Sequence, residues 1–247
     1  MARLPSHPRV GIISQARMTS TRLPGKVLLP VAGQPLLHYH VARLQQAGWP
    51  VLLAITTNAT DDPLADFAAA RQLPCCRGDE DDVLSRYWLT ARAQALDVIV
   101  RVTSDCPLLD GGLIGQGVAD YLRQNDSRLY LSNVLERTFP RGLDFEVFSR
   151  ELLDEAQAQA TAASDREHVT PYIHQNRSGR VRFQHVTRAE DRSSYRLTVD
   201  TADDFRLIQQ LIEAYGAAAL STDALVQLLD QHPELVALNA HIEQKKI

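Results

Sequence analysis

Apolar runs of strand length alternate with segments of helical spacing through the first hundred residues, and this order constrains the fold more than any other feature. The β-branched and aliphatic runs predict strands at residues 9–14, 51–57, 73–76 and 98–103. Helical spacing, with a proline near two of the starts, predicts helices at residues 35–48, 61–71 and 81–95. Strands that alternate with helices form parallel sheets that are covered on both faces. The sequence therefore predicts an α/β fold with a mostly parallel central sheet flanked by helices.

The simple alternation ends after Asp105. The later pattern predicts a helix at 113–124, strands at 129–132 and 143–148, helices near 150–160 and 165–176, strands at 181–187 and 195–199, and helices from Ala202 and Thr222. Because no internal repeat or linker interrupts the chain, we expect a single domain over residues 1–247. Within it, residues 133–190 are expected to form a smaller antiparallel excursion that carries substrate specificity or a dimer contact.

Charge and cysteine content limit the classes of partner. The chain has 26 Lys and Arg against 30 Asp and Glu in 247 residues, and a net charge of -4 argues against a broad nucleic-acid surface. Cys75, Cys76 and Cys106 match neither zinc-ligand spacing nor a disulfide framework. The N-terminus lacks a signal-peptide pattern, and no stretch approaches the roughly 20 apolar residues of a membrane span. We therefore expect a cytoplasmic protein with a small anionic ligand and no membrane or nucleic-acid partner.

Three cations lie in the loop after the first predicted strand. Arg17, Arg22 and Lys26 are separated by small or turn-forming residues, so their side chains and free backbone N–H groups can point at one anion. The loop does not match the Gly-x-x-x-x-Gly-Lys-Ser/Thr pattern of a Walker A motif. It is expected at the carboxyl edge of the sheet, where open parallel sheets bind ligands. A polyphosphate site and a solvated basic turn are both compatible with this spacing.

Asp105 and Asp200 each follow a predicted strand, so both are expected at the same sheet edge. Carboxylate oxygens are ligands that Mg²⁺ prefers, and one or two of them suffice beside phosphate oxygens. Asp105 could instead cap a helix or a turn, although Asp110 is the better N-cap, and Asp200 could lie in water. Because Thr201 can cap the following helix, no structural role is expected for Asp200.

A second group of polar residues lies in the middle region. Residues 141–146 alternate polar and apolar side chains, which predicts a half-buried strand with Asp144 and Glu146 on one face. Carboxylates on that face could bind hydroxyl or amine groups. Glu167 and His168 are expected at the start of a helix and could join the same pocket. Tyr172 and His174 receive no role. The candidate contacts for a second ligand are Asn133, Arg137, Asp144, Glu146, Glu167 and His168.

Six motifs in a fixed order give the chain a family resemblance. They are Gln15-Ala16-Arg17-Met18-x-Ser20-x-Arg22-Leu23-Pro24-Gly25-Lys26, Gly33-x-Pro35-Leu36, Arg101-x-Thr103-x-Asp105-Cys106-Pro107-Leu108, Gly142-Leu143-Asp144-x-Glu146-Val147-Phe148, Arg166-Glu167-His168-Val169-Thr170 and Val199-Asp200-Thr201. With these motifs the chain resembles the cytidylyltransferase family that includes the CMP-KDO and CMP-sialate synthetases. It most closely resembles the branch of spore-coat polysaccharide biosynthesis protein F-like proteins. The resemblance implies a GT-A-like nucleotidyltransferase fold.

The resemblance also implies roles for individual residues. The nucleotide-binding residues would be Gln15, Ala16, Arg17, Ser20, Arg22, Lys26, Gly78, Ser85 and Asp105. Gly78 and Ser85 would lie beside the cytosine base. Asp105 and Asp200 would bind Mg²⁺, and the catalytic residues would be Arg17, Lys26, Asp105 and Asp200.

The implied activity is Mg²⁺-dependent transfer of CMP from CTP to a sugar acid or related small anionic acceptor, with release of pyrophosphate. The implied setting is surface polysaccharide or glycoconjugate biosynthesis, and the implied assembly is a homodimer. A GT-A-like glycosyltransferase, or a nucleotidyltransferase that uses another nucleotide, is the alternative enzyme. A non-catalytic nucleotide-binding protein of such a pathway is the alternative outside enzymes. The identities of the acceptor and of a general base are left open.

Overall fold

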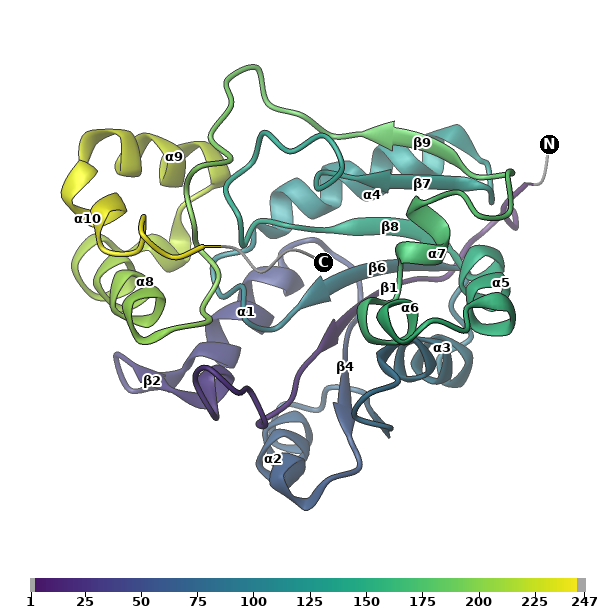
Figure 1. Ribbon diagram of the computed structural model, residues 1–247, viewed down its shortest axis with the longest axis horizontal. Helices are drawn as coiled ribbons and strands as arrows, with labels where there is room; N and C mark the ends of the chain where they lie inside the picture. The colour runs from purple at the N-terminus through teal and green to yellow at the C-terminus, as the bar shows by residue number, and fades with distance from the viewer. Residues whose placement is uncertain (1–2, 244–247) are drawn as a thin grey trace.

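Seven strands form one central sheet in the computed structural model, which describes residues 3–243 (Figure 1). They are β1 (Val10–Gln15), β4 (Val51–Thr56), β5 (Cys75–Gly78), β6 (Val98–Thr103), β7 (Leu129–Ser132), β8 (Glu146–Ser149) and β9 (Arg182–His185). In the order β5-β4-β1-β6-β8-β7-β9, the first four strands are parallel, β8 is antiparallel to β6 and β7, and β9 is parallel to β7. A separate antiparallel pair joins β2 (Pro30–Val31) and β3 (Gln34–Pro35). The prediction of a mostly parallel sheet with an antiparallel excursion is confirmed.

The order of the strands reverses at β1. From β1 the chain passes to β4 and β5 on one side, and β6 then pairs with the other side of β1. Loops that leave the carboxyl ends of β1 and β6 therefore diverge, and open α/β sheets bind their ligands in the crevice at such a point. The basic loop follows β1, and Asp105 follows β6.

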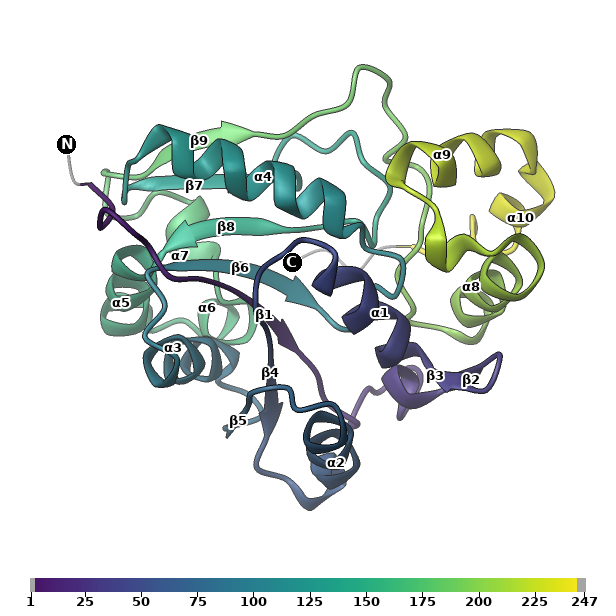
Figure 2. The same ribbon diagram turned by 180° about the vertical axis from the view of Figure 1, so that it is seen from behind.

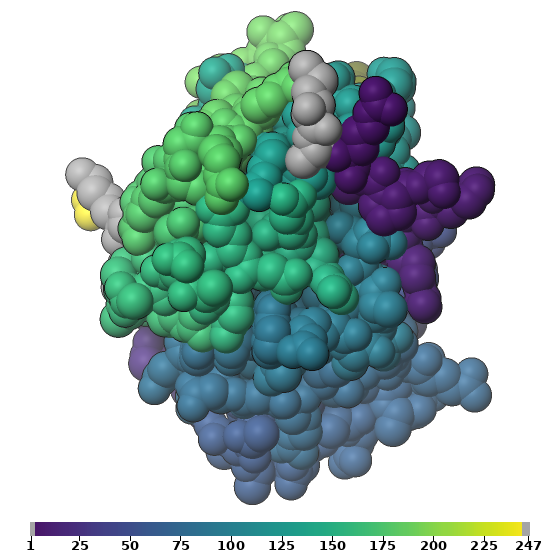
Figure 3. Space-filling model, turned by 90° about the vertical axis from the view of Figure 1, so that its right-hand side faces the viewer, coloured from purple at the N-terminus to yellow at the C-terminus, as the bar shows by residue number. Residues whose placement is uncertain are grey.

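Helices cover both faces of the sheet. They are α1 (Leu36–Gln45), α2 (Asp62–Ala70), α3 (Val83–Ala93), α4 (Gly111–Gln124), α5 (Arg150–Gln159), α6 (Ala163–His168), α7 (Pro171–His174), α8 (Ala202–Tyr215), α9 (Thr222–Gln231) and α10 (Pro233–Ala237), with 3₁₀ turns at Lys26–Leu28, Ala59–Asp61 and Ala217–Ala219. The helices α3, α5, α6 and α7 lie on the face seen in Figure 1, and α1 and α4 cross the opposite face in Figure 2. From the side, the green segment that contains α5 to α7 packs above the blue segment around α3 (Figure 3). Within residues 3–243, none of the helices is long and apolar enough to cross a membrane.

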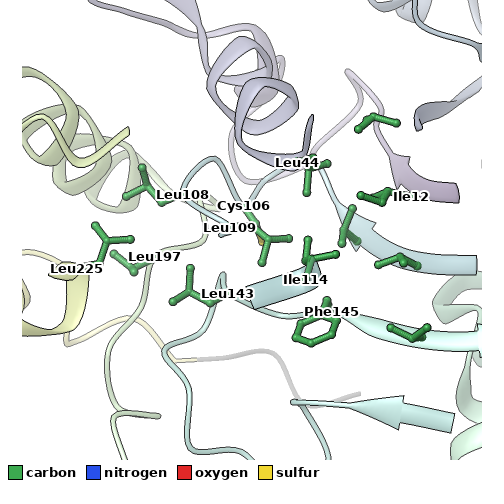
Figure 4. Packing of buried hydrophobic residues seen from close by; sticks show 14 of the residues in the cluster. Ile12, Leu44, Cys106, Leu108, Leu109, Ile114, Leu143, Phe145, Leu197 and Leu225 are labelled. Carbon is green, nitrogen blue, oxygen red and sulfur yellow. The ribbon is translucent and has the colours of Figure 1, made fainter. Parts of the chain in front are cut away.

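Neighbouring residues of the inner strands pack on opposite faces, because strand side chains alternate in direction. On β1, the fully buried Ile12 packs on the side of α1 and α4, whereas the fully buried Ile13 packs on the side of α3. Figure 4 shows Ile12, Leu44 and Ile114 within one continuous apolar cluster. Burial on both faces explains why these strands are nearly continuous apolar runs in the sequence.

The predicted strand at residues 195–199 is wrong. This segment is extended but makes an isolated bridge instead of a ladder, because its backbone bonds to two different loops. Leu197 N–H donates to the carbonyl of Arg141 at 2.6 Å, and Val199 N–H donates to the carbonyl of Asp105 at 2.8 Å. The segment therefore connects the loop before β8 with the loop after β6.

Several other elements differ from their predicted bounds, and the strand expected at 73–76 is β5 at Cys75–Gly78. The helix expected at 165–176 is two short helices, α6 and α7, with Val169 at φ 71 between them and Pro171 at the start of α7. Proline removes a helical N–H donor and clashes with the preceding turn, so it begins a helix more readily than it continues one. The strand expected at 143–148 begins only at Glu146, because Gly142, at φ 95, turns the chain just before it.

Candidate active site

The basic loop between β1 and Lys26 is attached to the sheet through a buried carboxylate. Asp61 accepts hydrogen bonds from the backbone N–H groups of Met18 at 2.8 Å and Thr56 at 2.9 Å, and from the Thr56 hydroxyl at 2.7 Å. At the end of the loop, Gly25 adopts φ 68, a left-handed conformation that glycine tolerates best. The loop is thereby fixed near both of its ends.

Lys26 lies between the two aspartates predicted as metal ligands. Its Nζ is 2.8 Å from Asp105 Oδ2 and 2.7 Å from Asp200 Oδ1. Burial opposes the ammonium charge, but Asp105 and Asp200 outweigh it and raise the pKa of Lys26 above its ordinary value. Burial likewise opposes ionisation of Asp105, yet the charge and hydrogen bond of Lys26 hold the pKa of that carboxyl at about 2. Lys26 and Asp105 are therefore both charged at neutral pH.

Asp200 has more partners than the sequence suggests. Its Oδ2 is 3.0 Å from Arg22 Nη2 and 2.7 Å from Arg196 Nη2. Arg196 in turn contacts Asp204, which forms a capping box with Thr201 at the start of α8. The expectation that Asp200 lacks a structural role is therefore wrong, because its carboxylate connects the basic loop to the start of α8. The predicted N-cap role of Thr201 is confirmed.

A chain of buried hydrogen bonds connects the ends of β1 and β6 to α1. His40 Nδ1 lies 2.8 Å from the carbonyl oxygen of Cys106, so Nδ1 must carry the proton and donate it. His40 Nε2 then accepts from the Ser14 hydroxyl at 2.8 Å, and Ser14 Oγ lies 2.7 Å from Ser104 Oγ. Burial lowers the pKa of His40 to about 4, against the opposing effects of the Cys106 carbonyl and the Asp105 charge. A neutral His40 thus holds the carbonyl of Cys106 directly and the side chain of Ser104 through Ser14, on the two sides of Asp105.

Two adjoining cavities lie at the carboxyl ends of β1 and β6. The inner cavity, of about 290 Å³, is lined largely by the basic loop, and the side cavity, of about 390 Å³, is lined by residues from three segments, 101–106, 134–146 and 168–174, together with the common wall. Two cavities that share one charged wall can bind two ligands side by side, in position to react with each other. The residues of this common wall are Gln15, Arg22, Thr103, Asp105, His168 and Asp200.

Most residues predicted to bind nucleotide lie around the inner cavity. Those that line it are Gln15, Ala16, Arg17, Ser20, Arg22, Lys26 and Asp105. Gly78 and Ser85 line neither cavity, and their place beside the base stays a prediction. A Cβ added at Gly78 would lie 2.7 Å from Cγ of Arg86, so the glycine makes room for that side chain. The Ser85 hydroxyl donates to the carbonyl of Asp82 at 2.8 Å in the first turn of α3.

Other residues of the inner cavity were missed by the sequence reasoning. Arg86, which is almost fully buried on α3, lines the cavity with Val83 and bonds weakly to the carbonyl of Glu80 at 3.4 Å. The Glu80 carboxylate contacts Arg17 at 3.4 Å and also accepts from the Thr19 hydroxyl. A signal for Arg86 was present, because a charged residue beside the apolar face of a predicted helix requires a partner.

Glu146 belongs to an internal hydrogen-bond network. Its Oε2 is 2.7 Å from Arg101 Nη1, and its Oε1 accepts from the Tyr130 hydroxyl at 2.7 Å and the Thr170 hydroxyl at 3.0 Å. These three bonds fix Glu146 in the wall of the side cavity, which it lines, and its contact with the acceptor stays a prediction. Asp144 precedes β8, so the two carboxylates do not share a strand face as predicted.

The other middle-region candidates divide between the wall and the core. Arg137 and Asp144 both line the side cavity and pair through two bonds of 2.6 Å and 3.1 Å. Asn133 lines neither cavity and is fully buried. Its Nδ2 donates to the carbonyl of Leu143 at 2.7 Å, and its Oδ1 accepts from the N–H of Phe145 at 2.9 Å. The predicted ligand contact of Asn133 is thus replaced by a structural role in the turn before β8.

Glu167 and His168 lie at the end of α6, not at the start of a helix as predicted, because α6 begins earlier, at Ala163. Glu167 lines the inner cavity, and His168 lines both cavities. His174, which received no role from the sequence, lines the side cavity. Burial, the main cause, lowers its pKa.

The carboxylates of the common wall suit a hard divalent cation. Asp105 and Asp200 converge on one positive group, the Nζ of Lys26, and carboxylate oxygens are preferred Mg²⁺ ligands. Residues 3–243 contain no group of three or more His, Cys, Asp or Glu side chains placed to hold a metal. A cation at this position would therefore complete its shell with ligand oxygens or water.

A larger hollow of about 680 Å³ lies elsewhere, between α9 and residues 187–190. It shares no lining residue with the other two cavities, and its Arg188 pairs with Asp223 inside the wall. Size alone would favour this hollow as the active site. The converging charges at the two smaller cavities identify them as the candidate active site.

Comparison with known proteins identifies the family of this chain. The sequence model of a family described as Cytidylyltransferase matches residues 10–246. The spore coat polysaccharide biosynthesis protein SpsF of Bacillus subtilis is 33% identical over 231 residues, which cover 90% of this chain and 94% of that protein. The structure of a cytidylyltransferase from Leptospira borgpetersenii is similar at a TM-score of 0.87 and 31% identity, covering 97% of this chain and 100% of that one. A structure of CMP:2-keto-3-deoxy-manno-octonic acid synthetase complexed with CTP shares the fold, at a TM-score of 0.59 and 16% identity over 84% of this chain and 99% of that one. The chain therefore belongs to the cytidylyltransferase family and is a nucleotidyltransferase.

Proposed function

We propose that this enzyme transfers CMP from CTP to a small anionic acceptor and releases pyrophosphate. The observation that carries the proposal is the common wall of the two cavities, where Arg22, Asp105 and Asp200 face both compartments. Transfer requires the attacking acceptor oxygen and the leaving pyrophosphate oxygen on opposite sides of the α-phosphorus of CTP, and holding the acceptor and CTP in that arrangement accounts for much of the rate. The inner cavity would hold the nucleotide and the side cavity the acceptor.

The basic loop would bind the triphosphate. Arg17, Arg22 and Lys26 line the inner cavity, and their charges would offset the negative charge that develops on the leaving pyrophosphate. Gln15, Ala16 and Ser20 line the same cavity, and the Ser20 hydroxyl and backbone N–H groups of the loop would add hydrogen bonds.

Asp105 and Asp200 would hold a divalent cation, which we propose is Mg²⁺. Support comes from the Lys26 ammonium, which both carboxylates contact within 2.8 Å. When bound there with the triphosphate, the cation would neutralise charge on the α-phosphate during attack by the acceptor oxygen.

For the acceptor we propose a sugar acid or a related small anion, in surface polysaccharide or glycoconjugate biosynthesis. The proposal is supported by the printed names of two similar proteins, SpsF and the CMP:2-keto-3-deoxy-manno-octonic acid synthetase. Location in the cytoplasm and assembly as a homodimer are further proposals from the family resemblance, and sedimentation velocity would test the second.

The direct test is a pyrophosphate-release assay with Mg²⁺. CTP, UTP, GTP and ATP are each combined with sugar acids, sugar phosphates, phosphonates and matched neutral sugars. We expect release with CTP and an anionic acceptor, and a CTP-induced rise in melting temperature, because ligand binding stabilises the folded state. Preference for another nucleotide, or CTP binding without release for any acceptor, would contradict the proposal.

A further inference from the structure

Arg141 is an unpaired arginine in the wall of the side cavity. The arginines that line this cavity are Arg22, Arg101, Arg137 and Arg141. The first three are paired: Arg22 with Asp200 at 3.0 Å, Arg101 with Glu146 at 2.7 Å and Arg137 with Asp144 at 2.6 Å. Within residues 3–243, the Arg141 side chain makes neither an ion pair nor a hydrogen bond. Its charge is therefore the uncompensated one among these arginines.

The backbone of Arg141 is held rigidly. Its N–H donates to the carbonyl of Tyr195 at 2.9 Å, and its carbonyl accepts from Leu197 N–H at 2.6 Å. The next residue, Gly142, has φ 95, and an added Cβ would lie 2.5 Å from Leu197 C and Thr198 N. Only glycine allows so close an approach of two backbones. Arg141 therefore projects from a fixed turn and not from a mobile surface loop.

The surroundings of Arg141 favour an added negative charge. Burial, followed by the charges of Arg137 and Arg196, lowers the pKa of Arg141. Asp144 opposes them, but that carboxylate already makes two bonds to Arg137. A guanidinium nevertheless stays protonated, and its planar donors match a carboxylate or phosphate with two parallel bonds. An oxyanion in the side cavity would relieve this unfavourable environment.

We infer that Arg141 binds the anionic group of the acceptor and thereby selects oxyanion-bearing acceptors over neutral ones. The inference rests on the proposed function. Arg141 does not line the inner cavity, so its role is separate from that of Arg17 and Lys26 on the triphosphate. Carboxylates and phosphates share this chemistry, and parallel assays with sugar acids and sugar phosphates separate them.

The test compares wild type with Arg141→Gln and Arg141→Lys in the pyrophosphate-release assay. Arg180→Gln is the matched control, because Arg180 is exposed, pairs with Glu155 and lines neither cavity. For Arg141→Gln we expect KM for the anionic acceptor to rise about tenfold or more, and KM for CTP to stay within about twofold. Arg141→Lys should recover part of the loss, because it retains the charge without the planar pair of donors. Selectivity for the anionic over the matched neutral acceptor should fall in Arg141→Gln and not in Arg180→Gln.

An unchanged acceptor KM in Arg141→Gln would overturn the inference and leave the proposed function standing. Equal rises in KM for CTP and for the acceptor would also overturn the inference, because they would indicate a general disturbance of the turn. Stabilisation by CTP, measured as a thermal shift for each variant, shows whether the inner cavity is folded. A wild-type enzyme that releases no pyrophosphate with any acceptor contradicts the proposed function itself. A wild-type enzyme that uses neutral acceptors as well as anionic ones contradicts only the inference.

Discussion

The inner and side cavities use their charged residues differently. Around the inner cavity, Lys26 bridges Asp105 and Asp200, which come from segments far apart in the sequence. A phosphate or metal could replace one partner of such a bridge. Around the side cavity, Glu146 and Asp144 each pair with a neighbouring arginine as part of the wall. The comparison teaches that paired charges line both cavities, and that the pairs of the inner cavity join segments farther apart in the sequence than those of the side cavity.

The largest effect should come from Asp200→Asn, which tests whether the inner cavity is functional. Loss of this charge should lower kcat by about 100-fold to 1000-fold, a range typical of removing one preorganised electrostatic contact. Pyrophosphate release with CTP is the measurement. Asp203→Asn is the control, because Asp203 lies three residues away in the first turn of α8 and lines neither cavity. Near-normal turnover of a folded Asp200→Asn protein would remove Asp200 from the catalytic set.

Asn133→Ala tests whether the middle region uses this residue for structure. The change leaves the carbonyl of Leu143 and the N–H of Phe145 without their buried partner. We expect the free energy of unfolding to fall by about 2–4 kcal/mol, measured by urea denaturation. KM for the acceptor should change little in the folded fraction. A large rise in this KM at unchanged stability would instead assign Asn133 to the ligand.

The pH dependence of stability tests the buried support of the inner cavity. The pKa of His40 falls from 6.5 to about 4 on folding, so between these values the unfolded chain binds a proton that the folded chain does not. The contribution is fully present above the unfolded pKa, is lost as pH falls toward 4, and amounts to about 3 kcal/mol at most. Unfolding measured across this range should show a shallower slope for His40→Gln than for wild type. Identical slopes would show that another group dominates. Asp105 contributes to the pH dependence of stability at lower pH, because its pKa falls from 3.8 to about 2 on folding.

The smallest effect is expected for Thr201→Ala, at the helix start that follows Asp200. Loss of the N-cap bond to Asp204 N–H should lower stability by about 1 kcal/mol. Ser221→Ala removes the equivalent N-cap of α9, so it should cost a similar amount. Only Thr201→Ala is expected to reduce kcat as well, because it loosens the segment that carries Asp200. Equal kcat values for the two variants would show that the N-cap bond of Thr201 does not affect catalysis.

The parallel part of the fold was predictable because its inner strands are buried on both faces. The run at 51–55 is apolar over its whole length, and the helices between the strands show clear spacing. The prediction of a strand at 195–199 was wrong for the same reason. The apolar residues of this segment are buried, although the segment is not part of a sheet. Burial leaves the same apolar signature in both cases.

The sequence by itself determined the alternation of strands and helices around the basic loop and the residue types of the candidate site, the loop cations and the carboxylates Asp105 and Asp200. These features depend on local periodicity and on residue types, which the chain displays directly. Only the tertiary structure decided which polar groups remain available to a ligand. Glu146 and Asn133 find their partners inside the fold, whereas Arg141 finds none within residues 3–243. Hydrogen bonds and ion pairs between distant segments require packing in three dimensions, and residue order alone does not specify them.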